Sequence, residues 1–118
     1  MLFSVMDAIH QRRSIRAYRP DQLTDGQLQA ILEAGLAAPS ARNTQPWHFT
    51  AVQDQALIGR INEAVRRRLM ETAEDDAARR TFSNPDWSVF YHAPTVIFIS
   101  CPPVSEMKYA QTDTGIAI

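Results

Sequence analysis

The spacing of hydrophobic residues changes along the chain, and the changes mark where helices and strands are expected. Apolar residues recur every three to four positions in residues 5–9, 28–36 and 57–69, which is typical of one face of a helix. Residues 47–52 instead alternate as a half-buried strand does. Residues 94–100 are a β-branched and aromatic run without alternation, which predicts a central strand covered on both faces.

Polar residues mark the expected starts of three helices. Ser4 and Thr24 each open a capping box, and Asp54 is expected to cap a longer, highly charged helix. The first helix is expected to end near Arg13. Gly35 is interpreted either as a site of close backbone approach or as a tolerated helix glycine. Val5, Met6 and Ile9 of the first helix are expected to face inward. The second helix carries Leu28, Ile31, Leu32, Gly35 and Leu36 on one face, and the third bears Leu57, Ile58, Ile61, Val65 and Leu69.

The second half of the chain carries weaker helix signals. Residues 71–80 are polar enough that the end of the third helix is expected to fray. Residues 84–87 predict a turn into a short helix whose apolar side is residues 89–91. A last helix is expected over 105–118, after two prolines end the second strand. These elements predict a single α+β domain over residues 1–118, with helices on a central sheet.

Composition narrows the class of protein. The chain has 118 residues, 45% hydrophobic and 21% charged, with a formal net charge of -1. These values are ordinary for a globular protein and indicate no general attraction to nucleic acid or anionic membranes. A single cysteine excludes an internal disulfide. Because neither an apolar run of about 20 residues nor a signal-peptide pattern is present, we expect a cytoplasmic location.

Several kinds of site have no counterpart in the sequence. Four glycines cannot supply a G-x-G-x-x-G or Walker loop, no G-x-S-x-G surrounds Ser40, and Cys101 has no histidine near it in sequence. The histidines His10, His48 and His92 lack metal-ligand spacing, so no metal site is expected.

A run of three arginines at positions 66–68 suggests a nucleic-acid patch at first. Glu63 and Glu71 flank it at helical spacing, so a salt-bridged exposed helix is the better interpretation, and RNA binding is a remote alternative.

Two polar stretches remain as candidate binding elements. Arg12-Arg13-Ser14-Ile15-Arg16 places three guanidinium groups and a hydroxyl at the end of the first helix. Such groups can clamp a phosphate, although an arginine cluster there is also typical of a solvated helix end. The second stretch, residues 38–47, is a polar loop bounded by Pro39 and Pro46, and Pro46 is expected to make Gln45 extended. An ordinary helix-to-strand connection would have a similar composition.

Together, the two stretches resemble the nitroreductase family of FMN-dependent oxidoreductases. Members of that family carry an R-x-S-x-[RK] element near the N-terminus and a P-S-x-x-N-x-Q-P-W loop after the second helix. The resemblance extends from about Val5 to the last residue. It implies helices packed around a central, mainly antiparallel sheet. It also implies ping-pong transfer of hydride from NADH or NADPH through flavin N5 to a nitroaromatic, a quinone or a similar acceptor.

The resemblance also implies roles for individual residues. The cofactor-binding candidates are Arg12, Arg13, Ser14 and Arg16 for the FMN phosphate and Pro39, Ser40 and Asn43 for the isoalloxazine. In many members the loop comes from the opposite subunit, which implies a homodimer with the flavin at the interface. Asp113 and Gly115 match the start of the helix that builds the dimer core. Gln45 and Trp47 resemble packing residues, and no role follows for Arg42.

Three points stay open on this interpretation. His48 could line the flavin pocket or lie on the strand's polar side. The group near flavin N5 is expected beyond Ile118. At that residue an apolar helical pattern stops without the usual end signals, so we expect a C-terminally incomplete fold. We expect such a chain to self-associate and to hold FMN weakly. The proposed hydride transfer to an acceptor has three alternatives. Flavin fragmentation and reductive dehalogenation would reuse the same FMN contacts, and the third alternative is a non-catalytic flavin-binding module.

Overall fold

A computed structural model describes residues 4–118 as five α-helices, one 3-10 helix and two strands. In chain order these are α1 (Val5–Gln11), α2 (Asp25–Leu36), η1 (Ala41–Asn43), β1 (His48–Val52), α3 (Gln55–Thr72), α4 (Asp76–Ser83), β2 (Val96–Ser100) and α5 (Ala110–Ile116). The strands pair antiparallel, with His48 opposite Ser100 and Val52 opposite Val96. The fold class is therefore α+β, as the sequence predicted.

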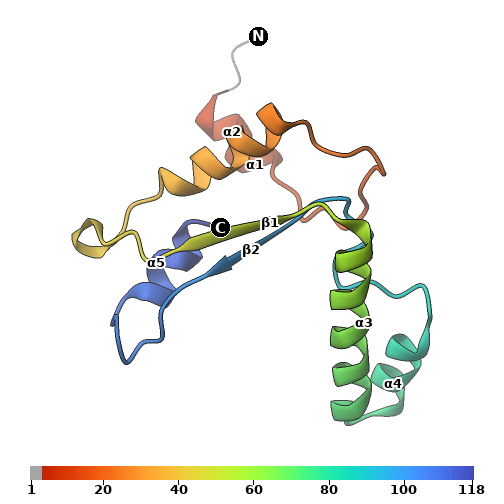
Figure 1. Cartoon of the computed structure of the whole chain (residues 1–118). Helices are drawn as coiled ribbons and strands as arrows, with labels where there is room; N and C mark the ends of the chain where they lie inside the picture. The colour runs from red at the N-terminus through yellow and green to blue at the C-terminus, as the bar shows by residue number, and fades with distance from the viewer. Residues whose placement is uncertain (1–3) are drawn as a thin grey trace.

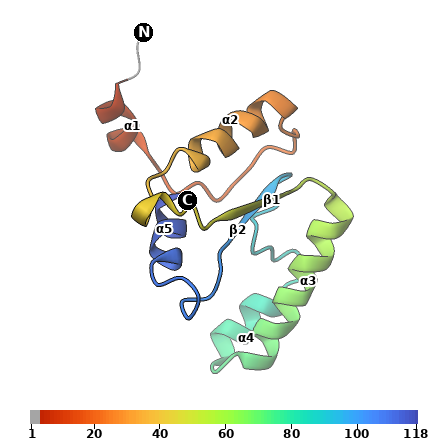
Figure 2. The ribbon, with the colours of Figure 1, turned by 60° about the vertical axis from the view of Figure 1, so that its left-hand side comes forward.

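The helices are distributed around this two-stranded ribbon rather than stacked in one block. Figures 1 and 2 show α2 lying along the ribbon, α5 and the loop before β1 at one end, and the α3–α4 hairpin projecting from the other end. The radius of gyration is 17.2 Å, whereas about 13.5 Å is typical of a compact domain of this length. The described arrangement is therefore open.

The predicted helix starts are confirmed. Ser4 and Thr24 both form complete capping boxes. The carboxylate of Asp54 accepts hydrogen bonds from the N–H groups of Ala56 and Leu57, at 2.8 and 3.1 Å. Each cap satisfies N–H groups that the first helical turn leaves without a partner, which is why these polar residues locate the starts correctly.

Gly35 is a site of close approach, as one of its two interpretations predicted. A Cβ at this position would lie 2.8 Å from two ring atoms of Phe49 and 3.2 Å from the carbonyl oxygen of Ala117. The absence of a side chain therefore lets α2 rest directly on β1 and on the end of α5.

The inward face predicted for α1 is wrong. Val5, Met6 and Ile9 are 77%, 58% and 61% exposed, and α1 has no buried residue. Hydrophobic periodicity identifies which face is apolar, but it does not supply a partner for that face within residues 4–118.

The fraying predicted for residues 71–80 is also wrong beyond Thr72. A separate helix, α4, begins where the carboxylate of Asp75 accepts a hydrogen bond from the N–H of Ala78 at 2.7 Å. Arg66 on α3 donates to the carbonyl oxygen of Phe82 at 3.0 Å, which ties the two helices together. Asp75 is the residue that indicates the start of this helix, and it is hard to recognise in the sequence because the whole segment is polar.

The short helix predicted after residue 84 does not form. Residues 84–93 are turns, with left-handed backbone at Tyr91 and His92. The Asn62 side chain accepts from the N–H of Val89 at 2.9 Å, and the Ser88 hydroxyl accepts from the N–H of Phe90 at 3.2 Å. These side chains accept hydrogen bonds from backbone N–H groups that would donate to backbone carbonyl oxygens in a helix.

Two predictions for the C-terminal third need correction. The last helix begins at Ala110 rather than Ser105, because residues 103–107 form turns in which the carbonyl oxygen of Pro103 accepts from Glu106 and Met107. Within the described residues β2 pairs only with β1 and is half-buried, so it is not a strand covered on both faces.

The buried core is small. Its hydrophobic members, each less than a tenth exposed, are Trp47, Val52, Ile58, Ala110 and Ala117. The accessible surface is 9174 Å², about 2,700 Å² more than the ~6,450 Å² typical of a compact monomer of 13.3 kDa. Large apolar side chains such as Ile31, Leu36, Ile116 and Ile118 are among the residues that remain exposed.

Candidate functional site

The arginine element lies in an extended, exposed segment directly after α1. Arg12 is the C-cap of that helix, where its N–H donates to the carbonyl oxygen of Ala8. Arg13 folds back, and its Nη1 donates to the carbonyl oxygens of His10 and Arg12 at 2.9 and 2.8 Å. Within residues 4–118 no carboxylate pairs with any of the three arginines, although Arg19 lies 3.8 Å from Asp21.

Glutamine side chains anchor the segment that follows this element. Gln22 donates to the carbonyl oxygen of Pro94 at 2.9 Å, and its own side-chain oxygen accepts from Gln53 and Thr95. Gln55 also donates to the Pro94 carbonyl, at 2.7 Å. The network ties the chain after the arginines to the end of β1 and the start of β2, which fixes where the element enters the fold.

Arg16 lines a cavity of about 420 Å³ between the extended segment and the turns before β2. Tyr18 of the extended segment also lines this cavity. The turns before β2 contribute Trp87, Tyr91 and His92 to the lining. His92 is held by a 3.0 Å hydrogen bond between its Nε2 and the carbonyl oxygen of Asp86. Arg16 is therefore a cation in the lining of a partly aromatic cavity that Asp86 also lines.

The loop between α2 and β1 is folded by its own polar side chains. The Ser40 hydroxyl accepts from the N–H of Gln45 at 2.9 Å, and the Ser40 carbonyl accepts from the N–H of Asn43 at 3.0 Å. The Thr44 hydroxyl donates to the carbonyl oxygen of Ala41 at 3.0 Å. These contacts close the short helix η1 and leave Pro39, Arg42 and Asn43 exposed, with Ser40 half-buried.

Three residues of this loop have left-handed backbone. The φ angles of Arg42, Asn43 and Gln45 are 54°, 55° and 46°. The extended conformation predicted for Gln45 is therefore wrong: Pro46 restricts the residue before it, but the bond to Ser40 imposes a left-handed turn instead. Non-glycine residues adopt this conformation at a cost, and such positions concentrate at functional sites.

Asp113 ties α5 to the loop. Its carboxylate is 5% exposed and accepts a hydrogen bond from the N–H of Ala41 at 3.1 Å. The neighbouring Thr114 hydroxyl is buried without a hydrogen-bond partner among the described residues. Of the two motif positions noted near the chain end, Asp113 is thus a direct support of the loop.

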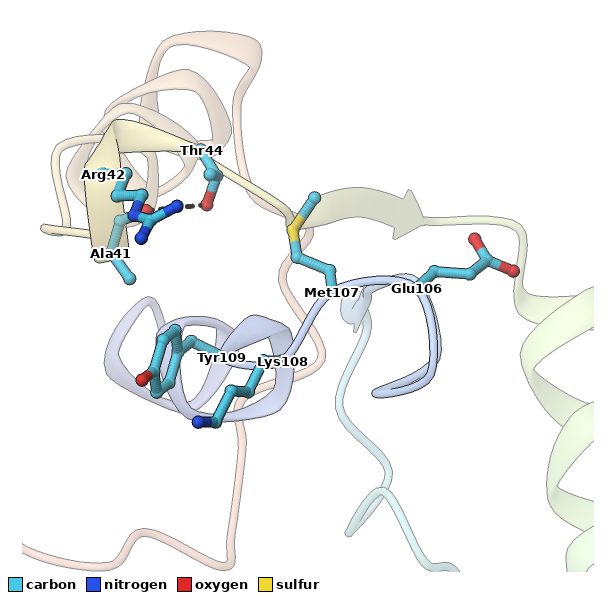
Figure 3. Close-up of a pocket in the computed structure, with 7 residues that line it drawn as sticks. All are labelled: Ala41, Arg42, Thr44, Glu106, Met107, Lys108 and Tyr109. Carbon is cyan, nitrogen blue, oxygen red and sulfur yellow. Dashed lines mark hydrogen bonds between the residues drawn. The ribbon is translucent and has the colours of Figure 1, made fainter.

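A second cavity, of about 380 Å³, separates the loop from the segment before α5. It is lined by Ala41, Arg42 and Thr44 on the loop side and by residues 106–109 on the other. Figure 3 shows Arg42 on one wall and Lys108 and Tyr109 on the facing wall. Sequence reasoning missed the 106–109 wall because nothing in its residue types shows that it faces a loop more than 60 positions earlier.

The two candidate elements are separate in this chain. Arg16 lines the aromatic cavity, whereas the loop lines the cavity of Figure 3, and no hydrogen bond or ion pair joins residues 12–16 to residues 39–45 in the described structure. Trp47 is buried beside the loop, as expected of a packing residue, whereas Gln45, for which packing was also expected, is exposed. His48 is exposed at the start of β1.

One further sequence expectation is confirmed by the described residues. The three consecutive arginines of α3 are part of a salt-bridged helix, because Arg66 lies 2.9 Å from Glu63 and Arg68 lies 3.4 Å from Glu71. None of the helices described in residues 4–118 combines the length and apolar character needed to cross a bilayer.

Comparison with known proteins identifies the family. A segment of 54 residues is 52% identical to an NADH dehydrogenase of Thermus thermophilus and covers 46% of this chain and 26% of that protein. A nitroreductase of Bacteroides fragilis with bound FMN is 35% identical, with a TM-score of 0.84 over 97% of this chain and 59% of its own. An FMN-dependent nitroreductase of Clostridium difficile is 38% identical, with a TM-score of 0.82 over 95% of this chain and 50% of its own.

In each case the chain covers less than two thirds of the relative's own length. The family model for nitroreductases matches residues 9–118, which include the arginine element, the polar loop and Asp113. The chain therefore belongs to the nitroreductase family.

Proposed function

We propose that this chain binds FMN and acts in an NAD(P)H-dependent oxidoreductase that reduces a nitroaromatic, a quinone or a similar acceptor. The main support for the proposal is that the arginine element has exposed guanidinium groups without a carboxylate partner. Arg12 and Arg16 are exposed and pair with no carboxylate in residues 4–118, while Arg66 and Arg68 are both paired. Uncommitted guanidinium forks fit the oxygens of a phosphate group.

The four polar residues of this element would contribute differently to phosphate binding. Arg12 and Arg16 supply guanidinium donors, and Ser14 between them adds a hydroxyl donor. Arg13 is the weakest of the four candidates, because its Nη1 already donates to two carbonyl oxygens at the end of α1. We therefore assign Arg13 mainly to capping that helix.

The loop residues Pro39, Ser40 and Asn43 would contact the isoalloxazine. When bound, FMN would supply the two-electron redox chemistry, for which no side chain of the protein is suited. The chain's part is to hold the contact surface still: Ser40 closes the loop through Gln45, and Asp113 fixes it to α5 through Ala41. A loop held in this way can orient a ring and exclude water from it.

We infer that the site is completed by a second copy of the chain. The phosphate element and the loop line different cavities of one chain, so a flavin that meets both would take one from each subunit. The large apolar side chains exposed on α2 and α5 supply surface for such a contact. An interface of this kind usually buries about 1,600 Å² in total, which the excess accessible surface can accommodate.

Titration of the apoprotein with FMN and with riboflavin tests the proposal. Because riboflavin lacks the phosphate, FMN is expected to bind at least tenfold more tightly. Arg12→Ala and Arg16→Ala should each weaken FMN by about one to two decades without weakening riboflavin. Arg67→Ala, which removes an exposed arginine of α3, is the matched control. Equal affinity for FMN in wild type and both clamp variants would reject the assignment.

Anaerobic addition of NADH or NADPH separates an enzyme from a binding module. Loss of the oxidised flavin absorbance on addition of a nicotinamide supports the oxidoreductase. A bound flavin whose absorbance never changes supports the non-catalytic alternative. A panel of nitroarenes, quinones and halogenated phenols, added to the reduced protein, then identifies the acceptor class by reoxidation.

A further inference from the structure

The cavity of Figure 3 contains two cations that the proposed flavin contacts do not use, Arg42 and Lys108. We propose that these two residues bind an anionic group, a phosphate or a carboxylate, on the reactant that exchanges electrons with the flavin. The inference rests on the proposed function, because Arg42 lies in the same loop as Pro39, Ser40 and Asn43. It adds a selectivity site beside the flavin contacts.

The charges around the cavity support this assignment. Neither Arg42 nor Lys108 pairs with a carboxylate among the described residues. Lys108 Nζ lies 5.3 Å from the centroid of the Tyr109 ring, a contact that attracts the ammonium without neutralising it. The Glu106 carboxylate points away from the loop (Figure 3), and the Asp113 carboxylate accepts from the Ala41 N–H. The cavity therefore presents net positive charge.

The backbone at Arg42 is the second line of evidence. Arg42 has φ 54° and ψ 23°, a conformation that glycine or asparagine adopts far more readily than arginine. The Asn43–Ser40 and Thr44–Ala41 hydrogen bonds impose it and place Arg42 on the cavity wall. A long cation at this strained position is explained if the guanidinium has a ligand to bind.

The size and chemistry of the cavity limit the ligand to part of a small molecule. About 380 Å³ is at the small end of the range for ligand sites. The guanidinium fork of Arg42 suits a compact anion, and Lys108 adds a second positive charge to the cavity lining. Two reactants could carry one: NADPH has a 2′-phosphate that NADH lacks, and an acceptor can carry a carboxylate or phosphate.

The test compares charged reactants with their uncharged counterparts. The variants are Arg42→Asn, which keeps a residue tolerant of left-handed backbone, and Lys108→Gln, with Arg42→Lys and Lys108→Arg as charge-retaining partners and Arg67→Gln as control. The kcat/KM ratio of NADPH to NADH is measured with a neutral quinone. The ratio of 4-nitrobenzoate to 4-nitrobenzamide is measured with one fixed donor.

We expect one of the two ratios to fall about tenfold in both neutral variants and to be largely restored by the charge-retaining ones. A fall in the first ratio identifies the donor's phosphate, and a fall in the second identifies an acidic acceptor. Ratios within twofold of wild type in both neutral variants would overturn the proposal.

Calorimetric titration of 2′-AMP against adenosine, and of nitrobenzoate against nitrobenzamide, gives a readout that does not depend on turnover. If the protein holds no flavin, the proposed function fails, yet these titrations still decide whether Arg42 and Lys108 bind an anion. If flavin absorbance is normal and neither anion binds better than its neutral counterpart, the anion site alone is rejected.

Discussion

The carboxylate of Asp113 on α5 accepts a hydrogen bond from the backbone N–H of Ala41 at 3.1 Å, across 72 positions of sequence. The contact joins the loop of the candidate flavin site to the helix that follows the Arg42–Lys108 cavity. Because Asp113 is only 5% exposed, water cannot readily replace it as the acceptor.

We expect Asp113→Ala to lower the free energy of unfolding by about 1–3 kcal/mol, because it leaves the N–H of Ala41 without its acceptor. Asp113→Asn keeps an acceptor oxygen and should cost less. Urea denaturation of the three proteins measures the difference. Equal midpoints for wild type and Asp113→Ala would show that the loop does not depend on this bond.

Gly35→Ala is expected to destabilise the protein. The new methyl group would lie 2.8 Å from the Phe49 ring and 3.2 Å from the Ala117 carbonyl oxygen. Overpacking of this kind costs about 1–3 kcal/mol and outweighs the ~1 kcal/mol that alanine gains over glycine inside a helix.

Gly59→Ala is the matched control for this prediction, because nothing lies within 4 Å of a Cβ at that position in α3. It should raise the free energy of unfolding by up to about 1 kcal/mol. Thermal unfolding of both variants measures the contrast, and a stabilising Gly35→Ala would contradict the close contact between α2, β1 and α5.

The Glu63–Arg66 pair should make stability depend on acid pH. Hydrogen bonds from the Arg66 guanidinium hold the pKa of Glu63 below its ordinary value. A carboxyl whose pKa is lower in the folded state contributes stability above its unfolded pKa, about 4.3, and loses it as the pH falls through the folded value. The pair is solvent-exposed on the Glu63 side, so the effect is small.

Melting temperatures of wild type and Glu63→Gln between pH 7 and pH 2 check this dependence. The gap between them should be largest above about pH 5 and should close at the acid end. Glu74→Gln, at an exposed glutamate that pairs with no cation in the described residues, is the control and should leave the pH dependence unchanged. A gap that stays constant over the whole range would show that Glu63 does not titrate differently in the folded state.

The 118-residue chain is expected to self-associate through its exposed apolar surface. A groove of about 470 Å³ between α2, the ribbon and α5 is lined almost entirely by apolar residues, among them Ile31, Phe49 and Ile116. Ile31 is 47% and Ile116 53% exposed, so burying them in a contact removes apolar area from water.

Sedimentation velocity over a range of concentrations measures this association. Ile116→Glu should shift the distribution toward monomer, because it places a charge in the apolar surface. Ala77→Glu, at an exposed position of α4 far from the groove, should leave it unchanged. A concentration-independent monomer in wild type would also weigh against the proposed dimer.

Local chemistry in the sequence determined where the first three helices begin and which residues form the two candidate elements. Caps at Ser4, Thr24 and Asp54 are correct because each depends only on residues two to three positions away. The arginine element and the polar loop could likewise be recognised as motifs, and the family match to residues 9–118 confirms the resemblance they carry.

Only the tertiary structure decided which residues each helix face and each loop contacts. The apolar face of α1 is exposed, residues 84–93 are turns held by Asn62 and Ser88, and Gln45 is left-handed because Ser40 accepts its N–H. The wall formed by residues 106–109 becomes part of a site only because Asp113 holds the loop against α5. Such contacts join residues far apart in the chain, and hydrophobic periodicity and turn propensity report only on neighbours within a few positions.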